Sequence, residues 1–181
     1  MTIAFALSAP DNGSYMLRGD APHPACPTCG MVSDRTWVDP GFKLRTSDFD
    51  ASYTFDGYLI VSERFRNAVP DDGLRFLELE SLPGFFVLDS QNEVAFDAAR
   101  RGTKFDRKCG ECGRFNVVAG AFPVFLVDAA PLPDVVWRTD VEFGTGDEQH
   151  PLILVGPMLA RRLNDAKLSG VDLRPVVDDS P

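Results

Sequence analysis

The chain has 181 residues, of which 44% are hydrophobic and 25% charged, and this composition is typical of a globular protein with one well-buried domain. The formal charge of −9 and the sequence pI near 4.6 disfavour general nucleic-acid binding and favour a basic partner. No stretch approaches the roughly 18 apolar residues of a membrane span, and the N-terminal residues lack a basic leader. We therefore expect a cytoplasmic protein without a membrane partner.

The first half of the chain predicts an irregular arm, short strands and one helix. Ser62 is a residue of the N-cap type, and the apolar residues around it recur at helical spacing until Pro70. Proline-rich and polar composition predicts an irregular arm, whereas β-branched and aromatic residues predict strands. The expected arm covers residues 8–27, and the expected strands lie within residues 35–44, 52–61 and 85–88.

The second half contains the clearest alternation. From Val135 to Phe143 every second residue is apolar or threonine, while Arg138, Asp140 and Glu142 fall on the other face, which predicts a half-buried strand. We expect residues 122–127 to be its partner across a proline-rich turn. Further elements expected from the pattern are a strand over residues 152–155 and a helix that begins at Pro157 and ends before Gly170.

Two segments of the chain follow the same order of elements. Residues 59–80 and residues 153–176 each predict a strand, a short helix, a turn and a second strand, and each segment lies downstream of one Cys-x-x-Cys-Gly motif. A diverged internal duplication explains this order, and so does the chance recurrence of such units in chains of mixed composition. We expect one domain over residues 1–181, built from two half-repeats at about 20–90 and 100–176.

The four cysteines form two tight pairs, Cys26-Pro-Thr-Cys29 and Cys109-Gly-Glu-Cys112. A disulfide within either pair would close only a very small loop, and cytoplasmic thiols stay reduced. Two Cys-x-x-Cys pairs supply the four thiolates that a structural zinc ion requires in a tetrahedron. Each pair is followed by glycine, at Gly30 and Gly113, which suits a tight turn with positive φ. The sequence therefore predicts one structural Zn²⁺ that joins the two halves.

Two other interpretations of the cysteines remain. A thioredoxin-like redox pair should follow a hydrophobic strand and open a helix, but Cys26 follows Ala-Pro-His-Pro-Ala and Cys29 precedes Gly-Met-Val-Ser-Asp. His23 lies three residues before Cys26 and is an alternative metal ligand.

Basic residues gather around the second cysteine pair of this acidic chain. They suggest either compensation of the negative charge of a four-thiolate zinc centre or binding of phosphate or an acidic partner. Our interpretation favours compensation. The residues are Arg100, Arg101, Lys104, Arg107, Lys108 and Arg114.

The residue patterns of common catalytic sites are absent from the sequence. The only histidines are His23 and His150, and the chain has no Gly-x-Ser-x-Gly elbow, no His-Glu-x-x-His and no phosphate-binding loop. Four thiolates would also fill the zinc and leave no position for an activated water. We assign no catalytic residue and no cofactor other than zinc, and we expect a non-enzymatic protein of the α+β class with a mostly antiparallel mixed sheet and a few short helices.

The paired Cys-Pro-Thr-Cys-Gly and Cys-Gly-Glu-Cys-Gly motifs resemble those of the double Cys-x-x-Cys-Gly proteins, a paralogous family prominent in myxobacteria. The segments Gly57-Tyr-Leu-Ile-Val-Ser-Glu-Arg-Phe65 and Gly156-Pro-Met-Leu-Ala-Arg-Arg162 are similar to strand-to-helix junctions of that family. The family is associated with immunity to toxins exchanged between kin cells. The resemblance implies a cytoplasmic protein that binds and blocks a cognate toxin, with Cys26, Cys29, Cys109 and Cys112 as metal ligands. It does not carry over the toxin-facing residues, which vary with the toxin.

Three functional hypotheses follow. The first is an inhibitor whose acidic surface suits a basic toxin such as a nuclease. The second is a zinc-ribbon adaptor for nucleic acid or transcription machinery, which the net charge disfavours. The third is a redox enzyme that uses the cysteine pairs, which predicts reversible disulfides and no bound metal. The sequence gives no indication of the oligomeric state.

Overall fold

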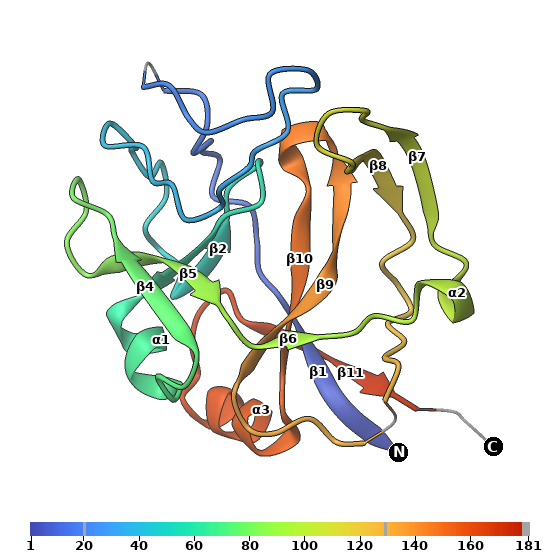
Figure 1. The fold of residues 1–181 in the computed structure, drawn as a ribbon. Helices are drawn as coiled ribbons and strands as arrows, with labels where there is room; N and C mark the ends of the chain where they lie inside the picture. Colours follow the sequence, from blue (N-terminus) through green and yellow to red (C-terminus); the bar gives the residue numbers. More distant parts are fainter. Residues whose placement is uncertain (20, 129, 179–181) are drawn as a thin grey trace.

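Two β-sheets and a few short helices make up the computed structural model, which describes residues 1–19, 21–128 and 130–178 (Figure 1). The larger sheet has strand order β11-β1-β10-β9-β8-β7, and β6 pairs with β9 outside this path. Its strands are β1 (Thr2–Ser8), β6 (Glu93–Val94), β7 (Lys104–Lys108), β8 (Phe115–Ala119), β9 (Val136–Thr145), β10 (His150–Val155) and β11 (Asp172–Val177).

The smaller sheet has strand order β2-β3-β5-β4. Its strands are β2 (Ala51–Tyr53), β3 (Leu59–Ser62), β4 (Leu74–Glu78) and β5 (Phe85–Ser90). The helices are α1 (Glu63–Ala68), α2 (Ala98–Arg101), α3 (Pro157–Asp165) and the 3₁₀ turn η1 (Gly146–Glu148). Apart from the parallel β6–β9 pair, the named strands pair antiparallel. The predicted α+β class with a mostly antiparallel mixed sheet is confirmed. No helix in the described ranges is both long and apolar enough to cross a membrane.

The main hydrophobic core lies between the two sheets and the helices α1 and α3. Phe65 of α1 and Leu159 and Leu163 of α3 are almost completely buried against Val61 of β3 and Val155 of β10. Both helices begin at the predicted positions, because their start signals are local in the sequence. Helix α1 also ends close to the predicted stop, whereas α3 ends at Asp165, earlier than the predicted end before Gly170. A second core covers the other face of the larger sheet, and a third lies beneath the irregular arm.

The irregular arm extends from the end of β1 to the start of β2, further than the predicted residues 8–27. The buried carboxylate of Asp56 fixes its first part by accepting hydrogen bonds from the backbone N–H groups of Met16 and Leu17, at 3.0 and 2.7 Å. The strand expected within residues 35–44 is absent, and this prediction was wrong. Asp34 Oδ1 accepts from the N–H of Thr36, and Asp39 Oδ1 accepts from the N–H of Gly41. These side chains satisfy the backbone locally in turns and thereby compete with strand pairing.

Strand β9 confirms the predicted half-buried strand but not its partner. Residues 122–127 contribute only an isolated bridge between Phe96 and Leu126, and β9 pairs instead with β10, β8 and β6. The register with β10 shifts between Pro151 and Ile153, so extra residues of β9 bulge out of the ladder. Val136 and Phe143 differ in parity and lie on opposite faces of the sheet, and both are buried because Val136 packs in the main core and Phe143 in the second core.

The two predicted strand-helix-strand units are present and have the same strand order in their sheets. In the first unit, β3 and β4 lie on either side of β5 in the sheet and β2 pairs with β3. In the second unit, β10 and β11 lie on either side of β1 and β9 pairs with β10. The middle strand follows β4 in the first unit but comes from the N-terminus in the second. Duplication and chance recurrence both account for this correspondence, and the two half-repeats stay a prediction.

Candidate metal centre

The first cysteine pair lies in a tight hairpin turn of the irregular arm. An isolated bridge pairs Ala25 with Val32, and inside it the N–H of Cys26 donates to the carbonyl of Met31 at 2.9 Å. The N–H of Gly30 donates to the carbonyl of Cys26, also at 2.9 Å, and Gly30 has φ of 74°. Glycine adopts this left-handed conformation without the backbone strain that a Cβ atom would add, and so the turn favours glycine after the second cysteine.

The second cysteine pair forms the same turn at the tip of the β7–β8 hairpin. Lys108 pairs with Phe115, and the N–H of Cys109 donates to the carbonyl of Arg114 at 2.8 Å. The N–H of Gly113 donates to the carbonyl of Cys109 at 3.1 Å, and φ of Gly113 is 73°. Each hydrogen bond has its counterpart in the first turn, so the two Cys-x-x-Cys-Gly motifs fold into matching knuckles.

The fold brings these knuckles together although they lie 83 residues apart. Cys26 Sγ is 3.9 Å from Cys109 Sγ, and Cys29 Sγ is 3.7 Å from Cys112 Sγ. All four sulfur atoms lie within 4.8 Å of one another. In a tetrahedral site with metal–sulfur distances of about 2.3 Å, neighbouring sulfurs are about 3.8 Å apart. The four cysteines therefore lie close enough to hold one metal ion, in the arrangement that such a site needs.

The centre is buried on one side and open on the other. Cys26 and Cys109 are each 7% exposed, whereas Cys29 is half-buried and Cys112 is exposed. The sulfur separations are far longer than the roughly 2.05 Å of a disulfide bond. The four thiols are free, and the donor set suits a metal that prefers soft ligands in a tetrahedron, such as zinc or iron.

The first cysteine of each knuckle is held in a setting that favours its thiolate. Hydrogen bonds from the N–H groups of Cys29 and Thr28 lower the pKa of Cys26 to about 7, and those of Cys112 and Glu111 lower the pKa of Cys109. For Cys29, the backbone N–H of Met31 acts in the same direction, but burial and the neighbouring sulfurs prevail and raise the pKa to about 12. Four adjacent thiolates repel one another unless a cation lies between them.

The other predicted site residues do not join this cluster. The ring of His23 lies 5.8 Å from that of Trp37, and the metal-competent group in the described residues contains only the four cysteines. Of the basic residues, Arg114 pairs with Glu142 and donates to the carbonyl of Val32, while Lys108 lies over the ring of Phe115. The compensation of thiolate charge by these residues stays a prediction.

A second polar group, which the sequence did not indicate, lies between the two sheets. Arg35, Tyr58, Arg138 and His150 line one pocket there. Because these residues lie far apart in the chain, no spacing pattern in the sequence predicts that they meet.

Comparisons with known proteins identify no relative. No protein-family model, no curated protein and no solved structure matches the chain.

Proposed function

We propose that the four-cysteine centre binds one structural Zn²⁺. Thiolate sulfurs from four protein side chains complete the coordination of the ion, so it has no open position for a substrate or an activated water. The matching knuckles support this role, because each supplies two ligands and neither can complete a tetrahedron alone. Metal analysis of the purified protein should give about one zinc per chain. Iron in place of zinc, or four titratable thiols without metal, would contradict the proposal.

We further propose that the protein is a non-enzymatic immunity protein that binds and neutralises a cognate bacterial toxin. The observation that carries this proposal is the pair of Cys-x-x-Cys-Gly knuckles at one centre, the feature on which the resemblance to the double-motif family rests. The net charge of −9 gives the surface an attraction for a basic toxin.

Two exposed acidic turns are candidates for the toxin-binding surface. Asp71 and Asp72 lie in the turn between α1 and β4, and Asp147 and Glu148 lie in η1 between β9 and β10. Figure 1 shows that the first turn lies beside α1, whereas the second joins β9 to β10 at the end of β10 that is far from α3. Because the turns are separated, we expect charge reversal to affect toxin binding at one of them more than at the other.

The test is a growth-rescue assay with the candidate toxin encoded beside this protein, together with a binding titration. Rescue with a stable complex supports the proposal. Rescue without a complex would indicate enzymatic detoxification, and no rescue would remove the immunity function. Two variants test the acidic turns: one replaces Asp71 and Asp72 with lysine, and the other replaces Asp147 and Glu148 with lysine. One of them should slow toxin association more than the other, most visibly at low salt, because charges are screened over about 10 Å at 0.1 M ionic strength.

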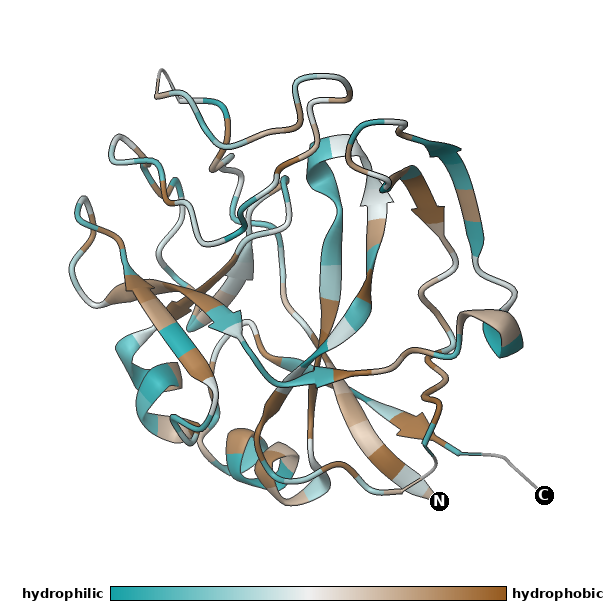
Figure 2. Cartoon of the chain, in the orientation of Figure 1, coloured by the Kyte–Doolittle hydropathy of each residue, from teal (hydrophilic) through white to brown (hydrophobic). Residues whose placement is uncertain are grey.

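One observation favours the second candidate function, a zinc-ribbon adaptor that binds nucleic acid. Strand β7 is an edge strand whose residues are all exposed, and it carries Lys104, Arg107 and Lys108 beside the exposed ring of Phe105. Figure 2 shows β7 as a mostly hydrophilic strand next to the hydrophobic β8. Basic side chains with an exposed aromatic ring are used to bind single-stranded nucleic acid. A gel shift that weakens with salt, and that is lost when these three basic residues are replaced by glutamine, would support this alternative.

A further inference from the structure

A pocket of about 50 Å³ lies where the smaller sheet faces β9 and β10 of the larger sheet. Tyr58 and Gly57 contribute from the β2–β3 hairpin, Arg138 from β9 and His150 from β10, and Arg35 reaches the pocket from the irregular arm. Gly57 lets the β2–β3 hairpin approach the His150 ring closely, because a Cβ atom at this position would lie 2.5 Å from Nδ1 of His150. The pocket is separate from the metal centre, since none of the four cysteines lines it.

Three residues of the pocket wall carry buried polar atoms without a hydrogen-bond partner among the described residues. These atoms are the Tyr58 hydroxyl, Arg35 Nε and Arg138 Nε. Tyr58 is only 2% exposed. A buried donor without a partner costs about 1–3 kcal/mol, and so three of them around one cavity indicate a missing acceptor.

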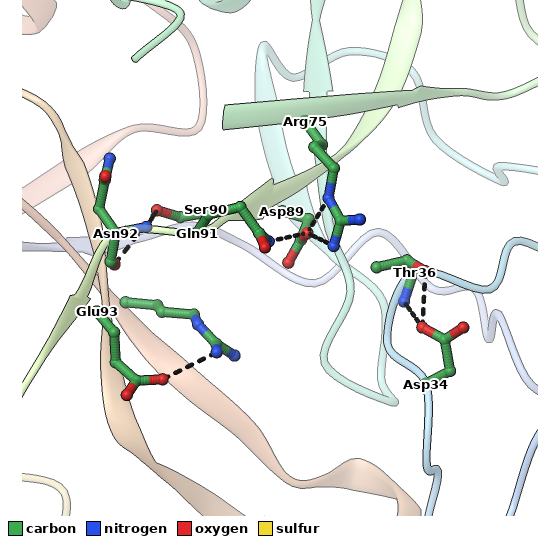
Figure 3. Close-up of polar contacts among 9 residues, drawn as sticks. Asp34, Thr36, Arg75, Asp89, Ser90, Gln91, Asn92 and Glu93 are labelled. Carbon is green, nitrogen blue, oxygen red and sulfur yellow. Dashed lines mark hydrogen bonds and ion pairs between the residues drawn. The ribbon is translucent and has the colours of Figure 1, made fainter. Parts of the chain in front are cut away.

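The carboxylates near the pocket already have partners and do not supply that acceptor. Asp89 accepts from Arg75 and Gln91, as Figure 3 shows. Glu142 pairs with Arg114, and the Nη2 atom of Arg138 pairs with Glu93 at 2.9 Å. The ionic groups of the wall are therefore neutralised in pairs, with Arg35 as the exception.

Arg35 carries a charge that no carboxylate of the described residues neutralises within ion-pair distance. Its Nη1 and Nη2 atoms donate to the backbone carbonyls of Asp56 and Asp147, at 2.7 and 2.9 Å. These bonds fix the guanidinium beside Tyr58, with Cζ 5.2 Å from the ring centroid. One positive charge and the unused Nε–H group remain for a ligand.

The uncharged groups of the wall bring no negative charge, and Tyr58 adds a donor. Burial raises the pKa of Tyr58 to about 12. The charge of Arg35 and the closeness of its side chain to the hydroxyl oppose this shift, whereas the negative charges of Asp56 and Asp34 add to it, so the phenol keeps its proton and can donate. His150 Nδ1 lies 3.0 Å from the carbonyl of Glu148, which can only accept, and so Nδ1 carries the proton. Burial lowers the pKa of His150, which keeps the ring neutral at pH 7.

We propose that this pocket binds a small monocarboxylate through the Tyr58 hydroxyl and the Nε–H groups of Arg35 and Arg138. A single carboxylate matches the one unneutralised charge, whereas a phosphate dianion would bring one negative charge too many. The volume of about 50 Å³ admits a carboxylate with a short side group. The carboxylate belongs either to a free small acid or to the end of a peptide chain. This site does not depend on the metal centre or on the immunity function.

The test is an NMR titration of the metal-loaded protein with acetate, with neutral acetamide as the control ligand. Acetate should bind saturably and shift the resonances of Tyr58, Gly57 and His150, whereas acetamide should not. A peptide with a free C-terminal carboxylate, compared with its amide, separates the two sources. Tighter binding of the free peptide than of acetate assigns the site to a chain end, and its failure to bind assigns the site to a free acid. Absence of saturable acetate binding would overturn the proposal.

Tyr58→Phe provides the decisive variant, because it removes only the hydroxyl. Loss of a hydrogen bond to a charged group should weaken acetate binding by about tenfold or more. Without ligand the variant should melt no lower than the wild type, since the hydroxyl has no partner to lose. Tyr15→Phe is the matched control, because Tyr15 does not line the pocket, and it should leave acetate binding unchanged. Unchanged acetate affinity in Tyr58→Phe would contradict the assignment.

Discussion

The two strand-helix-strand units begin their helices in different ways. In the first unit Ser62 is the N-cap of α1, and its hydroxyl accepts from the N–H of Phe65 and donates to Asp50, the residue before β2. In the second unit the N-cap of α3 is Gly156, which has no side chain, and Asp134 reaches across from just before β9. Its Oδ1 accepts from the N–H groups of Met158 and Leu159, at 2.8 and 3.2 Å.

The N–H groups of the first turn are therefore capped by a side chain next to the helix in one unit, and by a side chain from the loop before β9 in the other. A side chain at Gly156 would be excluded, since a Cβ atom there would lie 2.5 and 2.6 Å from the carbonyls of Pro133 and Leu132. The two knuckles differ in a similar way. Their turns match, but one is carried by the irregular arm and the other by a regular hairpin.

The largest expected effect is loss of the metal, which should act on both knuckles at once. Cys26→Ser and Cys109→Ser should each abolish stoichiometric metal binding and lower stability severely, because structural zinc contributes on the order of 10 kcal/mol in small zinc modules. Hydrogen exchange should then rise more in the irregular arm than in the β7–β8 hairpin, which keeps its strand ladder. Metal content and melting temperature are the measurements, with Ser33→Ala as the control. Retention of metal by either cysteine variant would contradict the shared centre.

The next effect concerns Asp50, which connects the first unit to the turn after α3. Its carboxylate accepts from Ser62 Oγ at 2.7 Å, Arg64 Nη1 at 2.7 Å and the N–H of Ser169 at 2.9 Å. Burial alone would raise the pKa of Asp50, but these hydrogen bonds and the Arg64 charge prevail and lower it. Asp50→Asn should therefore cost about 1–3 kcal/mol at pH 7.

The sign of the pH dependence follows from the lowered pKa of Asp50. The ionised form stabilises the folded state above the unfolded pKa of about 3.9, and this contribution is lost as the pH falls through the folded pKa. The stability difference between wild type and Asp50→Asn should shrink below about pH 4. Denaturant unfolding at several pH values measures it, with the exposed Asp48→Asn as the control. A difference that grows in acid would show that the carboxylate is not favoured in the folded state.

The helix caps give a third and smaller effect. Ser62→Ala and Asp134→Ala should each destabilise the protein by about 1 kcal/mol, the usual cost of removing a side-chain cap. Serine introduced at Gly156 should not rescue Asp134→Ala, because its Cβ atom would meet the carbonyls of Pro133 and Leu132. Chemical denaturation of the single and double variants is the measurement. A rescue would mean that the two units are interchangeable at this position.

The smallest effect should be the same in the two knuckles. Gly30→Ala and Gly113→Ala should each cost about 1 kcal/mol, because φ is 74° and 73° and an added Cβ would meet no atom within 4 Å. Gly110→Ala is the matched control, since its Cβ would also be free and its φ is not in the left-handed region. Thermal unfolding of the metal-loaded variants compares them. Unequal costs at Gly30 and Gly113 would show that the arm and the hairpin constrain their turns differently.

The features that the sequence predicted correctly are those specified by residues close together in the chain. The N-cap at Ser62 and Pro157 at the start of α3 mark both main helices. The alternation within β9 indicated a strand, but its partner was predicted wrongly, because pairing depends on residues distant in the chain. The strand expected within residues 35–44 failed because aspartate side chains close turns there.

The sequence by itself determined the two knuckles, since cysteine spacing and a glycine that tolerates positive φ are properties of five consecutive residues. Tertiary structure decided that Cys26 and Cys109 meet across 83 residues. It also decided that β1 completes the second unit, and that Arg35, Tyr58 and His150 surround one pocket. These arrangements depend on strand register and on the packing of two sheets, and neither leaves a periodic signal in the chain.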